Sequence, residues 1–346
     1  MKKLKILHLL QSSHFSGAEN VVCQIIDMFK DHNIEMAYCS RDGQIREVLK
    51  ENNISFHPIK KLCINEVRQV IAKYHPDIIH AHDTRASIIS SFVAKNIRII
   101  SHMHVNHENM NKVNFKTLLY LMCSIQFKHI FWVSNSAFNN YLYNKQILSK
   151  SSILYNVINR EAIINKAKKD NNYYTYDIVY IGRLTYQKNP ERLMYILKLA
   201  IEMNSKIKVA IIGTGDLFEA AKKLSVELGI EKNISFLGFI SNPYKILHDA
   251  KVMLMTSRFE GTPMCALEAI ALGVPIVCTP TDGLKDIITN DINGYMSNDD
   301  KVISEKIVKI VLDEKLYERL SRCAIEGFID MNNLNQYKQN LLKEYV

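Results

Sequence analysis

Two glutamates and the residues between them form the most informative chemical pattern in the sequence. The stretch RFEGTPMCALEAIALGVP holds Glu260 and Glu268, eight residues apart. It follows an apolar run, VMLMTS, which predicts a buried strand. Thr262 suits an N-cap, Pro263 suits the first helical position, and Gly273 suits the position after the last turn. The pattern therefore predicts a loop that carries one carboxylate and a helix that carries the other.

The start of this helix, predicted over Pro263–Leu272, is suited to binding an anion. Its free N–H groups, from Gly261 onward, would face the end of the preceding strand, where the helix dipole favours a diphosphate. Glu260 would then stand beside the phosphates, with Glu268 about a turn and a half inside the helix. Each carboxylate can accept hydrogen bonds from neighbouring hydroxyls, so one suits a sugar and the other a ribose. The alternative is a solvated loop glutamate and an ordinary helix glutamate.

A second predicted strand end carries two cations. The segment IGRLTYQKNPERL places Arg183 and Lys188 between a strand and a helix that Asn189-Pro190 opens. Two cations five residues apart in one loop can converge on a diphosphate and neutralise the charge of a leaving group. The alternative is a pair of exposed surface cations.

Glycines follow three other predicted strands. Gly213 and Gly215 in IIGTGDL form a tight turn, but the third glycine of a dinucleotide fingerprint is missing. Gly238 ends the run ISFLGF, where backbone groups could meet a base edge. Gly17, in SSHFSGAEN, lies between a predicted strand and helix, where backbone can approach a ligand closely. Each position can equally be a structural turn.

Three histidines gather near the end of another predicted strand. In RIISHMHVNH, the alternation of a strand puts His102 and His104 on the same face, and His107 follows. No carboxylate or cysteine completes a recognisable ligand set, so the sequence argues against a metal site. We expect a single histidine, His104, to donate a hydrogen bond to a ligand.

The elements that must position these residues alternate between strands and helices through most of the chain. This alternation predicts an α/β protein with parallel, doubly wound sheets. The pattern breaks in the polar, lysine-rich segment before Tyr176, which indicates two Rossmann-like domains, residues 1–165 and 171–326, facing a cleft at the strand ends. The last segment, residues 327–346, is long enough to return to the first domain.

Composition narrows the class of protein. Residues 1–170 hold 23 of the 44 basic and 13 of the 35 acidic side chains, so the positive net charge lies in the first half. A basic half attracts an anionic partner, and the absence of zinc spacing, a helix-turn-helix pattern or an arginine-rich arm argues against nucleic acid. The seven scattered cysteines are typical of a reducing compartment, and no apolar run is long enough for a membrane span. We expect a cytoplasmic protein.

The motifs together resemble the retaining glycosyltransferases of family 4, which have the GT-B fold. The glutamate motif appears as EGTPMCALE followed by AIALGVPIV, and the basic loop as GRLTYQK. The glycine loop appears as SGAEN, and HMHVN is similar to a histidine motif of capsule and exopolysaccharide enzymes. WVSNSAF and YNVIN also look like family positions, so the resemblance covers nearly the whole chain.

The resemblance implies a role for each residue. Arg183 and Lys188 would bind the donor diphosphate, Glu268 the ribose, and Glu260 the hydroxyls of the donor sugar. The backbone of Gly261, Thr262, Pro263 and Met264 would surround that sugar, Gly17 would approach the phosphate, and His104 would face the sugar near the reacting carbon. The family generally needs no metal or other cofactor and retains the anomeric configuration.

By this resemblance the protein moves a hexosyl or N-acetylhexosaminyl group from a nucleotide diphosphate sugar, expected to be a UDP-sugar, to a saccharide acceptor. The acceptor would be a lipid-linked glycan of bacterial surface polysaccharide synthesis, taken by the first domain at the inner face of the membrane. The apolar run FKTLLYLMCSIQFKHIFW, with Lys112, Lys116 and Lys128, could lie on an anionic membrane surface. The alternative places this run in the core.

The chain departs from the family pattern in the donor pocket. Ser16-Gly17 stands where many members have two glycines, Asp282 where a second glycine is common, and Asp286 where a glutamate is common. These departures leave the shape of the donor sugar pocket undetermined, but they do not change the expected class of reaction.

Two other functions remain as alternatives to transfer. One is a catalytically silent subunit that binds a partner, and the other is a sugar-nucleotide epimerase, which needs no acceptor. The intact glutamates and cations argue against the silent subunit. A dehydrogenase lacks its full glycine fingerprint here, and a two-carboxylate glycosidase would leave the cations without a role.

Overall fold

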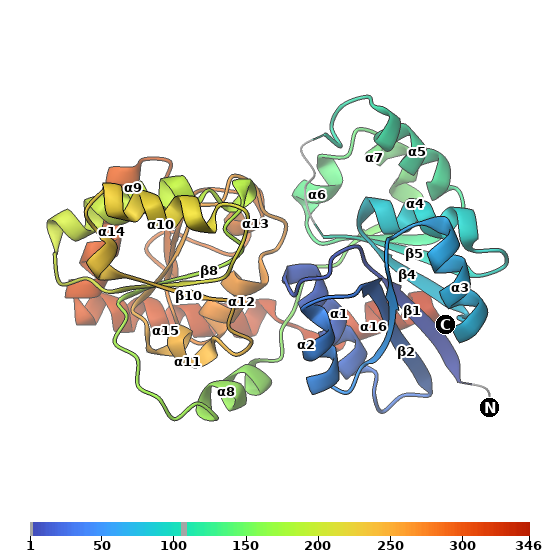
Figure 1. Ribbon diagram of the computed structural model, residues 1–346, viewed down its shortest axis with the longest axis horizontal. Coiled ribbons are helices and arrows are strands. Elements are labelled where there is room, and N and C mark those ends of the chain that lie inside the picture. Colours follow the sequence, from blue (N-terminus) through green and yellow to red (C-terminus); the bar gives the residue numbers. More distant parts are fainter. Residues whose placement is uncertain (1–2, 105–108) are drawn as a thin grey trace. The chain divides into compact units, whose positions relative to one another are not determined.

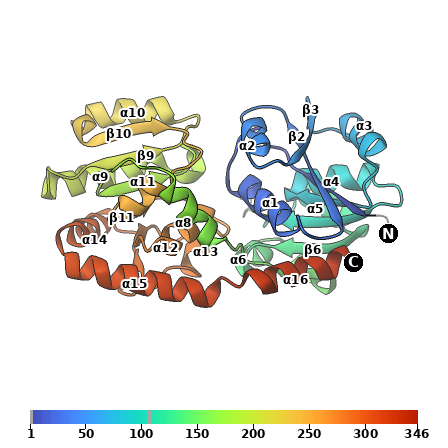
Figure 2. The same ribbon diagram turned by 90° about the horizontal axis from the view of Figure 1, so that it is seen from below.

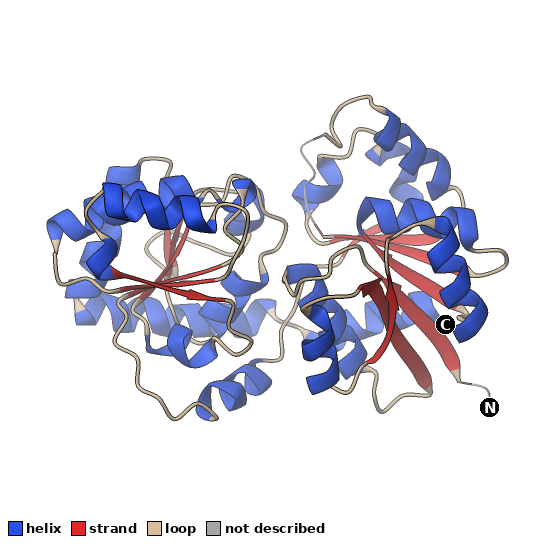
Figure 3. Cartoon of the chain, viewed as in Figure 1, coloured by secondary structure: helices blue, strands red, loops and turns tan. Residues whose placement is uncertain are grey.

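The computed structural model describes residues 3–104 and 109–346. The chain divides into two compact units. The N-terminal unit comprises Met1–Asn156 with Leu334–Val346, and the C-terminal unit comprises Val157–Asn333. Each unit has a parallel sheet between layers of helices, as Figure 3 shows. The prediction of two doubly wound α/β domains is confirmed.

The sheet of the N-terminal unit has seven parallel strands in its described part, in the order β3-β2-β1-β4-β5-β6-β7 (Figure 1). The strands are β1 (Leu4–Leu9), β2 (Ile34–Arg41), β3 (Ser55–Ile59), β4 (Ile78–His82), β5 (Arg98–Met103), β6 (Phe127–Trp132) and β7 (Ser151–Ile153). The helices are α1 (Gly17–Met28), α2 (Ile45–Glu51), α3 (Ile64–Tyr74), α4 (Asp83–Val93), α5 (Phe115–Ser124), α6 (Asn135–Asn139), α7 (Asn144–Ile147) and α16 (Leu334–Tyr345).

The sheet of the C-terminal unit has six parallel strands among the described residues, in the order β10-β9-β8-β11-β12-β13. The strands are β8 (Ile178–Ile181), β9 (Val209–Ile212), β10 (Ile234–Gly238), β11 (Val252–Met255), β12 (Ile276–Cys278) and β13 (Gly294–Met296). The helices are α8 (Arg160–Lys168), α9 (Pro190–Met203), α10 (Phe218–Glu227), α11 (Tyr244–Asp249), α12 (Met264–Ala271), α13 (Asp282–Lys285), α14 (Asp300–Leu312) and α15 (Glu314–Met331).

The boundary between the units lies earlier in the chain than the predicted residue 165. The segment from Arg160 to Lys168, expected to be a junction, is helix α8 and belongs to the C-terminal unit. Asn159 caps it by accepting from the backbone of Ala162, and Ile163 and Ala167 are buried. Only these two side chains of α8 are buried, so a helical apolar pattern is hard to recognise in this lysine-rich segment.

The C-terminal helix α16 groups with the N-terminal unit, and Figure 2 shows it along β6. Tyr345 is fully buried there, and its hydroxyl lies 2.8 Å from Nδ1 of His80. Lys128 Nζ donates to the backbone oxygen of Glu344 at 2.8 Å. The preceding helix α15 continues to Met331 within the C-terminal unit, so the crossing segment is shorter than the predicted residues 327–346.

No helix in the described ranges is long and apolar enough to cross a membrane. The run from Phe115 to Trp132, however, divides between two environments. Strand β6 is core, with Ile130 and Trp132 buried, whereas α5 buries one face and exposes the other.

Candidate functional site

The C-terminal unit has its topological switch between the neighbouring strands β8 and β11. From β8 the chain proceeds outward through β9 and β10, and it then returns to β11 on the other side and continues to β13. In open α/β sheets, ligands bind at the carboxyl ends of the strands at such a point. The loop after β8 carries Arg183 and Lys188, and the loop after β11 carries Glu260. The residues predicted from two separate motifs therefore meet at one edge of the sheet.

Backbone and side-chain hydrogen bonds tie these two loops together. Gln187 Nε2 donates to the backbone oxygen of Phe259 at 3.1 Å, and the Arg258 amide donates to the oxygen of Gln187 at 2.8 Å. Thr256 Oγ1 donates to the backbone oxygen of Lys188 at 3.0 Å. The Arg258 guanidinium also lies over the ring of Tyr186, 4.5 Å from its centroid. These contacts fix the two loops relative to each other.

Lys188 and Glu260 form a buried ion pair at the centre of this site. The Lys188 ammonium donates to Oε1 of Glu260, and the two side chains are 14% and 6% exposed. Ser257 Oγ donates to the same carboxylate oxygen at 2.5 Å. Burial alone would lower the pKa of Lys188, but the Glu260 carboxylate and the neighbouring Cys265 together outweigh this effect, so the pKa is raised. Lys188 is therefore a buried cation, held in place by a buried carboxylate.

Arg183 differs from Lys188 in its surroundings. Its side chain is exposed and makes no ion pair within the described part of the chain, while its carbonyl accepts a hydrogen bond from the Tyr180 hydroxyl at 3.3 Å. The structure thus brings Lys188 and Glu260 into direct contact and leaves the guanidinium of Arg183 available for an anion.

The glycines predicted to line the site make close backbone contacts. A Cβ on Gly213, which has φ +134°, would lie 2.1 Å from the backbone oxygen of Gly182. Gly213 donates from its amide to the oxygen of Gly238 at 2.7 Å, and Gly238 itself has φ +67°. A Cβ on Gly215 would lie 2.4 Å from the oxygen of Leu184. These glycines allow the β9 loop to pack against the loop that carries Arg183.

The helix after Glu260 begins one residue later than predicted. Helix α12 spans Met264–Ala271, and Pro263 stands at the N-cap position with no side-chain cap. Thr262 is therefore not the N-cap, because the extended backbone of Pro263, with ψ 120°, separates it from the helix. Gly273 does stand just past the end, with φ +78°. Glu268 is buried inside α12, where the Tyr244 hydroxyl donates to its Oε1 at 3.2 Å.

Gly261 has a close backbone neighbour that the motifs did not reveal. A Cβ built on Gly283, at the start of α13, would lie 1.2 Å from the backbone oxygen of Gly261. A glycine at position 283 is thus required for the loop beside Glu260 to keep its path. The available signal was the glycine of TDGLKDI, Gly283. The comparison with the family pattern singled out only Asp282 and Asp286 in this segment.

We expect Gly283→Ala to lower the thermal unfolding midpoint by several degrees. The added methyl group must displace the Gly261 carbonyl, and overpacking of this kind costs about 1–3 kcal/mol. The matched control is Gly327→Ala in α15, where no heavy atom lies within 4 Å of the new Cβ and a gain of up to about 1 kcal/mol is expected. Equal midpoints for the two variants would refute this reading of the contact.

The switch point of the N-terminal unit lies between β1 and β4, and histidines gather beside it. His104 directly follows β5, is 6% exposed, and places Nε2 2.8 Å from Nδ1 of His82. The Asp83 carboxylate accepts from the His104 backbone amide at 2.9 Å. Burial lowers the pKa of His104, although nearby Asp83 opposes the change. His104 is therefore a neutral imidazole near neutral pH.

The structure groups the histidines differently from the sequence prediction. His102 and His104 do share a face, with ring centroids 4.2 Å apart, whereas His107 lies outside the described residues. His82 joins them, and their ring nitrogens are close enough for a metal to be considered. The motifs in the sequence did not single out His82 and Asp83, which follow the apolar run of β4. The alternation of His80 and His82 was the available signal.

Gly17 is the first residue of α1, just after the loop that follows β1. Ser16 Oγ donates to Oε2 of Glu19 at 2.5 Å, and Glu19 is buried. Gly17 therefore lies between a strand and a helix, as predicted, and the strand order puts this helix start at the switch-point edge of the sheet.

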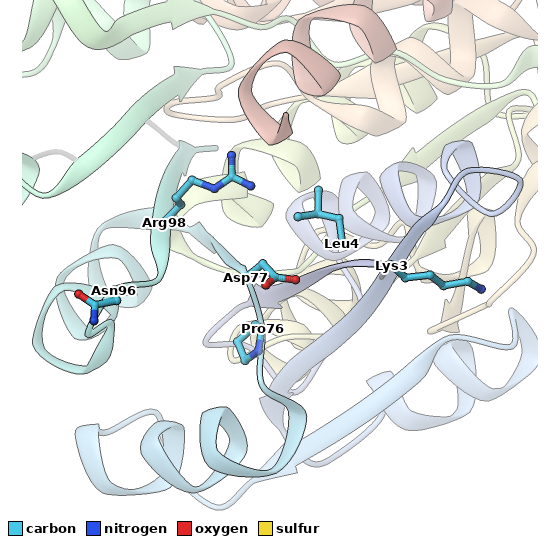
Figure 4. A pocket seen from close by; sticks show the side chains of 6 residues that line it. All are labelled: Lys3, Leu4, Pro76, Asp77, Asn96 and Arg98. Carbon is cyan, nitrogen blue, oxygen red and sulfur yellow. The ribbon is translucent and has the colours of Figure 1, made fainter. Parts of the chain in front are cut away.

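A pocket of about 440 Å³ lies elsewhere in the N-terminal unit (Figure 4). It is lined by Lys3, Leu4, Pro76, Asp77, Asn96 and Arg98. These residues stand at the amino ends of β1, β4 and β5, the edge opposite to the histidines. Its position is thus not that of ligand sites in this class of sheet.

Comparison with known families decides the class of the C-terminal unit. Residues 159–326 match the family described as "Glycosyl transferases group 1". This part of the chain is a group 1 glycosyltransferase domain. It contains the loop with Arg183 and Lys188, both motif glutamates and the glycine turns. Of the residues predicted to meet the donor, Gly17 and His104 lie outside the matched region.

Relatives of the group 1 glycosyltransferase domain extend the likeness to the whole chain. The capsular polysaccharide biosynthesis glycosyltransferase CapH of Staphylococcus aureus is 26% identical over 364 residues, covering 99% of each chain. The UDP-Gal:alpha-D-GlcNAc-diphosphoundecaprenol alpha-1,3-galactosyltransferase of Escherichia coli is 23% identical, covering 97% of this chain and 96% of its own. Among solved structures, Anabaena HepE in complex with UDP and glucose has a TM-score of 0.84 at 16% identity over 98% of each chain. The fold is GT-B, as predicted.

Proposed function

We propose that this chain is a retaining glycosyltransferase that moves a hexosyl or N-acetylhexosaminyl group from a UDP-sugar to a lipid-linked saccharide in bacterial surface polysaccharide synthesis. The observation that carries the proposal is the buried Lys188–Glu260 pair beside the exposed Arg183 at a topological switch point. Two cations and a carboxylate at one edge suit a ligand that joins a diphosphate to a sugar.

The roles follow from the surroundings of each group. Arg183 has no competing ion pair among the residues described, so its guanidinium can bind a phosphate bidentately. Lys188 is held by Glu260 and can neutralise charge as the nucleotide diphosphate leaves. One oxygen of Glu260 accepts hydrogen bonds from Lys188 and Ser257. The other has no hydrogen-bond partner among the described residues and can accept from a sugar hydroxyl. Glu268, steadied by Tyr244, suits the ribose.

The names of two relatives support the finer parts of the proposal. The E. coli relative is named for a UDP-galactose donor and an acceptor on diphosphoundecaprenol, and HepE was solved with UDP and glucose. CapH is named for capsular polysaccharide biosynthesis. We extend these donor and acceptor classes to the present chain as part of the proposal.

The proposed reaction needs no metal, because Lys188 and Arg183 supply the positive charge that a divalent cation would otherwise bring to the diphosphate. Transfer should then survive the chelation of divalent cations. Loss of transfer in the presence of a chelator, restored by magnesium, would count against this part of the proposal.

The reaction class can be tested with UDP-sugars and a lipid-linked saccharide acceptor. We expect release of UDP that depends on the acceptor and a product whose new linkage has the anomeric configuration of the donor, as read by NMR. Conversion of the donor to an epimer without an acceptor would favour the epimerase. Absence of any turnover, with the donor bound, would favour the silent subunit.

The acceptor side of the proposal includes an anionic membrane surface. Helix α5 exposes Phe115, Leu118, Met122 and Ile125, which are 80%, 41%, 66% and 79% exposed and recur at helical spacing. The segment 109–150 around it contains five lysines and no aspartate or glutamate. An exposed apolar stripe in a segment whose charged side chains are all cations suits the interface of a bilayer with anionic lipid headgroups.

We expect the protein to float with vesicles that contain phosphatidylglycerol at low salt and to dissociate near 1 M salt, where the screening length falls to about 3 Å. Phe115→Ser combined with Ile125→Ser should weaken this binding without lowering the unfolding midpoint, because both side chains are exposed. The matched control is Val226→Ser combined with Leu312→Ser, which removes exposed apolar side chains from the C-terminal unit. Equal binding by both double variants, or no flotation at low salt, would contradict the membrane surface.

A further inference from the structure

Five buried histidines lie together on one face of the N-terminal sheet. They come from three neighbouring strands and the residue after the last of them, and all are at most 6% exposed: His8, His80, His82, His102 and His104. Desolvation lowers the pKa of every member of this group. The family resemblance gives a role only to His104, so the purpose of the other buried imidazoles is open.

Three of these rings form a line. Nδ1 of His8 lies 3.0 Å from Nε2 of His82, and Nδ1 of His82 lies 2.8 Å from Nε2 of His104. The ring centroids of these pairs are 5.3 and 5.1 Å apart, with interplanar angles of 26° and 24°. Each centroid separation exceeds the N···N distance by only the radii of two five-membered rings. The rings therefore meet edge to edge, nitrogen facing nitrogen, and we call His8–His82–His104 the histidine chain.

This geometry favours hydrogen bonds over a shared metal ion. Zinc lies about 2.0–2.1 Å from each histidine nitrogen and is tetrahedral, so two nitrogens bound to one ion lie roughly 3.3 Å apart or more. The observed separations of 3.0 and 2.8 Å are those of N–H···N hydrogen bonds.

A neutral imidazole has one N–H, so the three tautomers of the histidine chain must agree. Either every ring carries its proton on Nδ1 and donates toward His104, or every ring carries it on Nε2 and donates toward His8. At the inner end, Nε2 of His8 is buried and has no partner among the described residues. Either form leaves one N–H without an acceptor among the described residues, at His8 Nε2 or at His104 Nδ1. His8 is 0% exposed inside the sheet, whereas His104 is 6% exposed at the carboxyl edge, where ligands bind in sheets of this class, so the inner end should hold the lone pair. All three protons then lie on Nδ1.

At the outer end, Nδ1 of His104 is also without a partner in the described part of the chain. With the histidine chain in the Nδ1–H form, this nitrogen is a donor with no acceptor among the residues that the structure describes. The backbone of His104 is held by the Asp83 carboxylate, which accepts from its amide. The ring is therefore fixed at both its backbone and its Nε2, while the buried Nδ1 has no partner among the described residues.

We propose that His8 and His82 are positioning residues that hold His104 in the Nδ1–H tautomer, so that it donates a hydrogen bond to a hydroxyl oxygen of the donor sugar. The ligand part rests on the proposed function, whereas the tautomer is a property of the protein alone. His82 acts directly on His104, and His8 sets the direction of donation by His82.

The tautomers can be read in full-length protein labelled with ¹⁵N-histidine, from the ring nitrogen shifts and their couplings to the ring protons. The signals of each ring are assigned by their loss in the corresponding substitution. We expect His8, His82 and His104 all as Nδ1–H, which is not the form that free neutral histidine prefers in water. His104 as Nε2–H, or as an exchanging mixture, would overturn the proposal without any reference to activity.

His82→Leu gives the second test, with His102→Leu as its matched control. His102 is equally buried and stacks on His104, but neither of its ring nitrogens has a partner among the described residues. We expect His82→Leu to release His104 from the Nδ1–H form and to lower kcat on the order of tenfold to a hundredfold, the scale of a lost orienting partner. His102→Leu should leave the His104 tautomer unchanged.

The outcomes separate this proposal from the proposed function. An unchanged His104 tautomer in His82→Leu would overturn the role of His82, whatever the activity. The His104 tautomer could change in His82→Leu while the wild type shows no turnover of UDP-sugars. That result would support the histidine chain and refute the glycosyltransferase reaction. If His82→Leu does not fold, the wild-type tautomers still decide the proposal.

Discussion

Lys188→Met is expected to destabilise the C-terminal unit by about 3–5 kcal/mol and to abolish most of the transfer activity. The substitution leaves the Glu260 carboxylate buried without its partner, and breaking one side of a buried ion pair has a cost of this size. It also removes a cation from the leaving diphosphate, which should lower kcat/KM by at least about 2 kcal/mol of transition-state stabilisation, as should Glu260→Ala. Unfolding monitored by circular dichroism and turnover of UDP-sugars measure the two effects.

The double variant Lys188→Met with Glu260→Gln separates stability from catalysis. Removing both charges leaves no unpaired buried ion, so the double variant should regain much of the stability that either single change loses. It should remain as inactive as Lys188→Met, because neither the cation nor the carboxylate is restored. Near-normal turnover in Lys188→Met and Glu260→Ala would show that the site lies elsewhere.

Mild acid is expected to destabilise the N-terminal unit steeply. Burial lowers the pKa of His8 to about 3, from 6.5 in the unfolded chain, and lowers those of the other four clustered histidines. As the pH falls below 6.5, the unfolded chain takes up protons that the folded chain refuses. The stability that the neutral histidines contribute is therefore fully present above pH 6.5 and is lost as the pH falls toward 3. Between pH 7.5 and 5.5, each histidine that stays neutral in the folded chain lowers the free energy of unfolding by about 1 kcal/mol. The cluster as a whole therefore lowers it by several kcal/mol.

The chain offers a specific probe for this effect. Its single tryptophan, Trp132, is buried in β6 of the same unit, so its fluorescence reports the unfolding of that unit in urea. His102→Leu should reduce the difference in unfolding free energy between pH 7.5 and 5.5 by about 1 kcal/mol. A urea midpoint that does not move between these pH values would contradict the neutral, buried cluster.

The strand ends were predictable because their signals are local. Apolar runs followed by glycine or polar residues marked β8, β9 and β11, and the motif residues then fell at the carboxyl ends of these strands. The edge strands β3 and β13 were missed. β3 is half-exposed and contains Pro58, and β13 has only three residues, so neither has the continuous apolar run of a central strand.

Contacts between the motifs could not be predicted from the sequence. That Lys188 pairs with Glu260 depends on β8 and β11 being neighbours, which the order of the motifs along the chain does not specify. The histidine chain has the same cause. His8, His82 and His104 are far apart in sequence, and they meet because β1, β4 and β5 are adjacent in the sheet. The approach of Gly283 to Gly261 is likewise a tertiary contact with no local pattern.

The central claim is that the loops after β8 and β11 bind a nucleotide diphosphate sugar. The most direct test is the shift in thermal unfolding midpoint of the purified protein with UDP, GDP, ADP and their sugar conjugates, with and without magnesium. A ligand that binds only the folded state raises the midpoint by mass action. The account predicts a rise with UDP and UDP-sugars that is independent of magnesium and is lost in the double variant Lys188→Met with Glu260→Gln. No rise with any of these nucleotides, or an equal rise in that double variant, would contradict it.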